Sequence, residues 1–321
     1  MKTSVKVWLA AAVILIAAGA VLFTVVMSAH SWNFKEVFRN EYETRSFEIT
    51  QHFVNISIRS DTADIRFKKT ESGNARVEIF DDPLIEASAD VRDGSLAIEI
   101  RDTRKWYEKI GFFRAESSKI TLYLPEASYS SLTINESTGD IDLPAPFSFQ
   151  KIDITASTGD VKLGASASGN IKIETDTGDI HAESLTAGSL ELSVSTGKVT
   201  VKSVSCDGDI SVRVSTGKAV LEDVLCKNLI STGSTGHIEL KDVKADGLLS
   251  LERSTGDIRF DKCDAEEILI TTSTGDVSGS LLSDKVFITK SDTGRVQVPE
   301  TTAGGKCKVT TDTGDINITI E

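Results

Sequence analysis

The sequence predicts an all-β fold: a parallel β-solenoid of about ten regular coils of 19–20 residues, preceded by irregular N-terminal coils and one transmembrane helix. The first observation is a Thr-Gly dipeptide that recurs ten times at spacings of 19 or 20 residues. The second is an alternation of apolar and polar residues on both sides of each Thr-Gly, which is typical of half-buried strands. The third is a composition with 40% apolar but only 6% aromatic residues, which favours a repetitive aliphatic core.

The N-terminal region contains an uncharged apolar segment, residues 7–27, whose 21 positions are enough to span about 30 Å as a helix. A cleaved signal peptide would have an apolar region of roughly 7–15 residues, so we predict an uncleaved anchor. The short basic tail, residues 1–6, is most simply cytoplasmic. We therefore expect a single-pass protein of the cell membrane, with residues 28–45 as a juxtamembrane connector and the C-terminal domain extracytoplasmic.

Residues 46–130 are expected to form irregular β coils and a cap. The motif SDTAD at 60–64 has the register of the later turns, with Ala63 in the place of the glycine. Strand-like runs follow at 76–80, 96–100 and 119–124 without the turn motif. The segment 101–116 mixes aromatic and basic side chains, which suits either a binding patch or a lid over the first coil, and we favour the lid.

Residues 131–321 are predicted to be the regular solenoid. Ser or Asp precedes the Thr of every turn, and glycine supplies a positive φ there. The residue four after the turn glycine is apolar in nine coils and is Gly279 in the other, and the residue before it is polar in nine of ten. A unit this short cannot bury its own apolar face, so coils must stack at about 4.8 Å. The predicted structural turn glycines are Gly139, Gly159, Gly178, Gly197, Gly217, Gly236, Gly256, Gly275, Gly294 and Gly314.

These motifs resemble the bacterial putative-adhesin family of domains of unknown function. The resemblance rests on SDTADIRF, the run SKITLYLP and the STGDI turns repeated head to tail after one membrane span, and it covers roughly residues 46–321. It implies a membrane-anchored β-solenoid on the extracytoplasmic face, connected with the cell envelope or cell surface. It implies no catalytic residues.

The function that we predict from the sequence is a non-enzymatic adhesin or cell-envelope scaffold. An accessory or sensor protein of an envelope-stress system is an alternative that the sequence does not separate from it. A β-helix enzyme acting on polysaccharides is less favoured, because the short coils leave almost no loop to wall a cleft. The tripeptide Asp-Thr-Gly at 176–178, 292–294 and 312–314 is also the aspartic-protease signature, but Ser replaces Asp in seven of ten turns, so we interpret it as a turn former.

The aspartates after the turn glycines are weak candidates for a calcium site. Asp140, Asp160 and Asp179 would lie about 5 Å apart in stacked coils, and Ca²⁺ would relieve their repulsion. A solvated acidic row is the interpretation that we favour, and we predict no cofactor. Four turns carry another residue in this place, which argues against one ligand along the whole row: Lys198, Lys218, His237 and Arg295.

The four cysteines fall at small or apolar positions of the repeat, so we predict that they are core residues: Cys206, Cys226, Cys263 and Cys307. Cys206 and Cys226 occupy the same place in neighbouring coils, which leaves a disulfide between them open.

The expected partners follow from charge and from the end of the chain. A net charge of −13 argues against nucleic acid. The membrane, through the single span, and a protein or cell-envelope polymer are the expected partners. The last coil, DTGDINITIE at 312–321, is expected to leave an open edge through which the rod associates with a second copy or another strand.

Overall fold

A computed structural model describes residues 3–29, 32, 42–83, 85–102 and 117–321. The chain divides into two compact units, one containing the N-terminal helix and the other containing all the β-structure. Most of the predicted connector, and the expected lid from residue 103 on, lie outside the described residues.

The N-terminal unit contains helix α1 (Thr3–Ala29). Its segment Trp8–Ala29 has a mean hydropathy of 2.8, and it is long and apolar enough to cross a membrane. A helix with these properties near the N-terminus fits a membrane anchor or a signal sequence.

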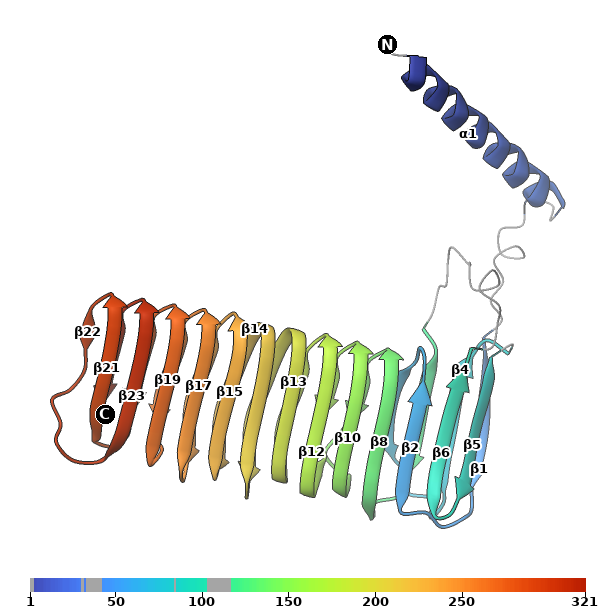
Figure 1. The fold of residues 1–321 in the computed structure, drawn as a ribbon. Helices are drawn as coiled ribbons and strands as arrows, with labels where there is room; N and C mark the ends of the chain where they lie inside the picture. The colour runs from blue at the N-terminus through green and yellow to red at the C-terminus, as the bar shows by residue number, and fades with distance from the viewer. Residues whose placement is uncertain (1–2, 30–31, 33–41, 84, 103–116) are drawn as a thin grey trace. The chain divides into compact units, whose positions relative to one another are not determined.

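The second unit is the predicted parallel β-solenoid, seen in Figure 1 as a row of parallel arrows. Each coil has one strand before the Thr-Gly corner and one after it, and several coils continue around a second corner into a short third strand. The strands of the regular coils are β8 (Ser128–Thr138), β9 (Ile141–Leu143), β10 (Ser148–Thr158), β11 (Val161–Leu163), β12 (Ser166–Thr177), β13 (Ile180–Cys206), β14 (Asp209–Cys226), β15 (Asn228–Thr235), β16 (Ile238–Ala245), β17 (Leu248–Thr255), β18 (Ile258–Cys263), β19 (Glu267–Thr274), β20 (Val277–Leu281), β21 (Lys285–Thr293), β22 (Val296–Gln297), β23 (Gly305–Thr313) and β24 (Ile316–Ile320).

The two corners of each coil are formed by residues with different backbone conformations. At Gly159, φ is 138°, and an added Cβ would lie 2.0 Å from the carbonyl oxygen of Gly139 in the coil before. Only glycine therefore fits where the coils approach this closely. The second corner, six residues later, uses left-handed residues such as Asp223 at φ 54° and Asp242 at φ 51°, where a short polar side chain tolerates the conformation.

The N-terminal part of the solenoid combines one regular coil with an antiparallel cap. β2 (Asn55–Ser60) and β3 (Asp64–Lys69) flank the SDTAD turn and pair in parallel with β8 and β9. β6 (Ser95–Arg101) and β7 (Lys119–Leu124) stack in parallel on their other side. The outer strands run antiparallel to their neighbours: β1 (Glu43–Ile49), β4 (Ala75–Asp81) and β5 (Glu86–Arg92).

The other end of the solenoid differs from the sequence prediction, because the last two coils are stacked out of chain order. β23 pairs with β19 on one side and with β21 on the other, and β24 lies in the same way between β20 and β22. The coil with residues 305–320 is therefore internal, and the coil with residues 285–297 forms the end of the rod (Figure 1). The prediction that the C-terminal coil is the open edge is wrong.

The interior is a continuous aliphatic core that runs the length of the solenoid, with residues such as Ile58, Ile210 and Ile268 fully buried. The cysteines are part of this core. All four are buried free thiols, so Cys206 and Cys226 form no disulfide in this structure. Burial raises the pKa of Cys226 to about 12, which leaves it in the unreactive thiol form.

Candidate functional site

The aspartates that follow the turn glycines form a hydrogen-bonded ladder along one corner of the rod. The backbone N–H of Asp160 donates to Oδ1 of Asp140 at 2.9 Å, and that of Asp179 donates to Oδ1 of Asp160 at 2.8 Å. The row begins one coil earlier than we predicted, because Asp140 N–H donates to Oδ1 of Asp64 at 3.2 Å. Each carboxylate thus satisfies a backbone donor of the next coil.

The residues that replace Asp in this row make different contacts. His237 replaces the carboxylate as an acceptor, because its Nδ1 receives the N–H of Asp257 at 3.0 Å. Lys198 and Lys218 lie opposite each other where β13 and β14 pair continuously through the turn. At the end of the rod the ladder follows spatial order, with Arg295 N–H donating to Oδ1 of Asp315 at 2.8 Å.

This geometry bears on the calcium candidates. Asp140, Asp160 and Asp179 do lie in one row, but each uses Oδ1 to accept a backbone N–H. Within the described residues, no group of three His, Cys, Asp or Glu side chains is placed to hold a metal ion. Calcium binding here stays a prediction, and the ladder supplies a structural role for the same residues.

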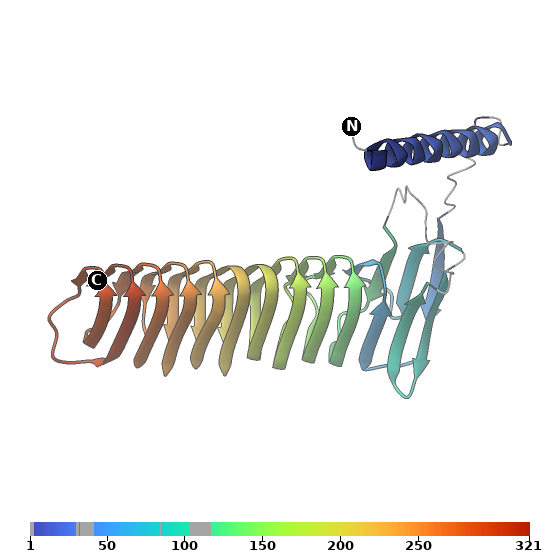
Figure 2. The same cartoon turned by 45° about the horizontal axis from the view of Figure 1, so that its top comes forward.

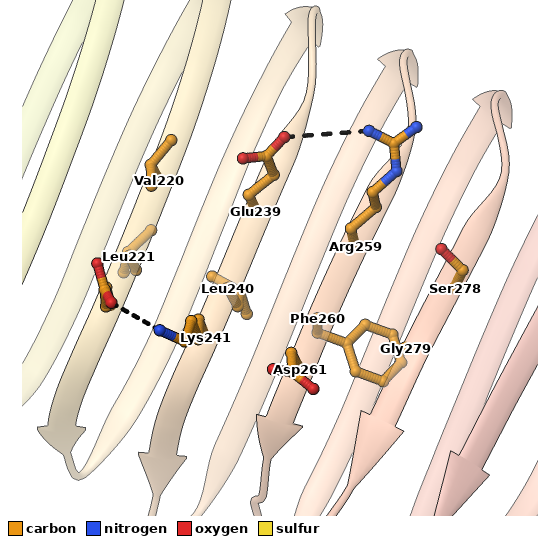
Figure 3. A pocket seen from close by; sticks show the side chains of 11 residues that line it. Val220, Leu221, Glu239, Leu240, Lys241, Arg259, Phe260, Asp261, Ser278 and Gly279 are labelled. Atoms are coloured by element: carbon orange, nitrogen blue, oxygen red, sulfur yellow. Dashed lines mark hydrogen bonds and ion pairs between the residues drawn. The ribbon is translucent and has the colours of Figure 1, made fainter.

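A second candidate site is a groove of about 500 Å³ across β14, β16, β18 and β20. Figure 3 shows the outward side chains of these strands aligned in a row across the groove: Val220, Glu239, Arg259 and Ser278. The buried residues Leu221, Leu240 and Phe260 lie beneath it. Gly279 also lines the groove. Because it has no side chain, it leaves room for the Phe260 ring, whose Cδ2 would lie 2.5 Å from an added Cβ.

Ion pairs hold the charged side chains of the groove. Lys241 Nζ lies 2.9 Å from Oε1 of Glu222, and Arg259 Nη1 lies 4.0 Å from Oε1 of Glu239 (Figure 3). Lys218 Nζ reaches the other oxygen of Glu239 at 2.6 Å. The hydrogen bond from Lys241 lowers the pKa of Glu222, so this carboxylate is ionised at neutral pH. A general acid needs the opposite shift.

We did not predict the groove from the sequence, although two irregularities of the repeat mark it. Val220 is the single apolar residue at a position that is polar in the other nine coils. Gly279 is the single residue without a side chain at a position that is apolar in the other nine. Val220 and Gly279 each interrupt the apolar–polar alternation of a strand on one side of the groove. These exceptions to the repeat are the sequence signal that could have indicated the groove.

The family model described as Toastrack DUF4097 matches residues 53–217 and again residues 199–321. No curated protein matches the sequence.

The solved structures that resemble the chain include one from Bacteroides fragilis described as a putative adhesin, with 14% identity and a TM-score of 0.39, covering 88% of this chain and 99% of that one. A putative adhesin from Parabacteroides distasonis has 14% identity and a TM-score of 0.48, with 85% and 98% covered. A protein from the same species described as a putative lipid binding protein has 18% identity and a TM-score of 0.46, with 86% and 96% covered.

The two matches to the family model together cover nearly the whole β-solenoid, including the SDTAD coil and the regular coils. The chain belongs to the Toastrack DUF4097 family.

Proposed function

We propose that this chain is a non-enzymatic, membrane-anchored adhesin or cell-envelope scaffold, with α1 in the membrane and the β-solenoid outside the cytoplasm. The observation that carries the proposal is the solenoid itself, in which coils of the same short length stack into a rod with a continuous core. Such rods present long outward surfaces, and their core residues serve packing rather than chemistry.

The state of the groove carboxylates supports a binding role over a hydrolytic one. Glycosidases need one carboxyl group with a raised pKa beside a second carboxylate. In the groove, Glu222 has a lowered pKa, and Glu239 is paired with two cations. The raised carboxyl pKa of Glu136, about 8, belongs to a side chain inside the rod that is only 4% exposed.

The topology is tested by protease protection in cells that produce the full chain with an N-terminal tag. Protease added outside the cytoplasmic membrane should degrade the solenoid and leave the tag protected. A protected solenoid would overturn the proposed orientation, and loss of the tag from mature chains would show that α1 is a cleaved signal.

The binding role is tested by sedimenting the detergent-solubilised full chain with isolated cell-envelope polymer. Ser278→Trp fills the groove from an outward position and should reduce co-sedimentation. Ser250→Trp, an outward position of β17 outside the groove lining, is the matched control and should not. Equal binding by the two variants would exclude the groove, and the absence of any bound polymer would contradict the polymer partner.

A further inference from the structure

The end coil of the rod combines an open strand edge with exposed apolar side chains. β21 pairs with β23 along one edge, and no strand of the described residues pairs with its other edge. That edge presents backbone N–H and C=O groups to solvent. Six large apolar side chains are exposed within the described part of the solenoid, and four of them lie in residues 282–296: Leu282, Val286, Ile288 and Val296.

The charge of this coil differs from that of the rest of the rod. Residues 28–321 carry 33 basic and 48 acidic residues, a net of −15, so two rods repel each other along their sides. Residues 282–297 carry three basic residues and two acidic ones, a net of +1. The end is therefore the part of the rod that a second, equally acidic copy approaches at least electrostatic cost.

We propose that β21 pairs with β21 of a second copy, joining two rods end to end across a two-fold axis. Two identical strands related by such an axis run antiparallel, and the pairing closes without leaving another edge. Ile288 is 50% exposed, the most of the four apolar side chains, and we place it on the axis opposite its own copy. Val286 then lies opposite Lys290, whose aliphatic stem covers it.

The connection between β22 and β23 passes the end of the rod and leaves the side chains of Val286 and Ile288 exposed. The segment 298–304 returns from β22 to β23 and bulges past the rod in Figures 1 and 2. It is held to the start of β21 by a hydrogen bond from the Thr301 hydroxyl to the Lys285 carbonyl, and Val298 packs on the core. The outward side chains of Val286 and Ile288 stay exposed beside it.

The second copy gives the adhesin a partner. The chain enters the solenoid at the antiparallel cap, because β1 begins at Glu43, whereas β21 lies at the opposite end of the solenoid. Paired rods would thus carry their two N-terminal segments at opposite ends of a double-length rod. With the anchoring proposed above, on which this step rests, such a pair joins two membranes.

The pairing is tested with the full chain in detergent, independently of topology. Ile288→Cys should give a disulfide-linked dimer between differently tagged copies under mild oxidation. Ile230→Cys occupies the same place in a central coil, is 38% exposed, and should stay monomeric. Ile288→Asp should weaken association about tenfold or more by sedimentation, whereas Ile230→Asp should not. Equal crosslinking at both sites, or a monomer at high concentration, would overturn the pairing.

The bridging of membranes is tested by mixing two vesicle populations that carry the full chain with the solenoid facing outward. The vesicles should cluster, and Ile288→Asp should abolish clustering while Ile230→Asp preserves it. If clustering is absent although the detergent dimer forms, or if it survives Ile288→Asp, bridging through β21 is wrong.

Discussion

Arg253 places a guanidinium inside the rod, where it is only 1% exposed. Its Nη1 donates to the carbonyl oxygen of Val214 at 3.0 Å, passing over Gly233, where an added Cβ would lie 1.6 Å from that nitrogen. Nε and Nη2 have no partner within the described residues, and burial lowers the pKa of the side chain. Gly233 therefore leaves room both for the Arg253 guanidinium and for the carbonyl oxygen of Val214, which would lie 1.9 Å from the same Cβ.

Replacing this cation by an apolar side chain of similar length should stabilise the protein. Arg253→Met removes a buried charge that no carboxylate balances, and we expect the free energy of unfolding to rise by about 1–3 kcal/mol. Urea unfolding measures it, with Arg253→Ala as the comparison, because its cavity should lower stability. A clear loss of stability in the Met variant would show that the guanidinium has partners that compensate its burial.

Glu136 predicts how stability depends on pH. Its Oε1 accepts the N–H groups of Ala63 and Thr138, both at 3.2 Å, yet burial dominates and raises its pKa from 4.5 to about 8. Between these values the unfolded chain ionises Glu136 while the folded one keeps it protonated. Its favourable contribution is complete below about pH 4.5 and is lost as the pH rises through about 8.

The expected change is roughly 3–5 kcal/mol over that interval. Glu136→Gln keeps the accepting oxygen without a titratable proton, so its unfolding free energy should lack this decline. Urea titrations at about pH 5 and about pH 8 measure the difference. A parallel decline in both proteins would assign the pH dependence to other groups.

Substitutions at Asp160 distinguish a purely structural hydrogen-bond ladder from a calcium site. Asp160→Asn keeps Oδ1 as an acceptor for Asp179 N–H and should change stability little, whereas Asp160→Ala should cost about 1–2 kcal/mol. The melting temperature measured with Ca²⁺ and with a chelator should be the same. Stabilisation by Ca²⁺ that is lost in the Asn variant would establish the metal site.

Among the structural elements, the end coil is held by a clip that spans the coil inserted beneath it. Lys285 is 4% exposed, and its Nζ donates to Oδ1 of Asp264 at 2.7 Å. Burial disfavours the charge on Asp264, but hydrogen bonds from Lys285 and Ser283 outweigh it and lower its pKa. Asp264 lies just before β19, and β23 stacks between β19 and β21, so the contact reaches past the inserted coil.

Breaking this clip should loosen the end coil alone. Lys285→Met leaves Asp264 without its cation, and we expect a local loss of about 2–4 kcal/mol. Hydrogen exchange should accelerate in residues 285–297 and stay unchanged in the central coils. Lys290→Met, which removes an exposed ion pair with Asp292, is the control. Equal effects of the two changes would mean that the clip does not hold the end.

The repeat predicted the coils but not the order of the last two. The turns at Gly294 and Gly314 both read Asp-Thr-Gly at the common spacing, so each coil fits either place. Tertiary contacts such as the Lys285–Asp264 ion pair determine which of the two coils takes the end position, and the 19–20-residue period of the sequence does not specify such contacts. Thr289, at a position that is mostly aliphatic, is only partly buried at the end of the rod, but Ser231 at the same position of a central coil is fully buried, so polarity there does not identify the end coil. The aspartate row was likewise predicted as a row, but its hydrogen bonds to backbone N–H groups depend on how neighbouring coils stack, which the repeat does not specify.

For the whole rod, stability should be close to the sum of similar coils and their contacts. Leu190 and Ile210 occupy the same place in adjacent coils, so deleting residues 190–209 joins Ser189 to Ile210 in register. The shortened protein should fold, with the same circular dichroism per residue and a smaller denaturant slope. Deleting residues 190–199 instead shifts the register and should abolish folding. Similar behaviour of the two deletions would contradict additive stacking.

The exchanged order of the last two coils also restricts the order in which the coils can form during synthesis of the chain. A growing chain can add each coil to its predecessor as it emerges, up to β20. Residues 285–297 emerge next, but the strands they rest on, β23 and β24, do not yet exist. This coil must wait unpaired, or rest on β19 until residues 305–320 displace it. A chain whose synthesis stops before Gly305 therefore cannot complete the end of the rod, so a completed end shows that residues 305–320 have been made.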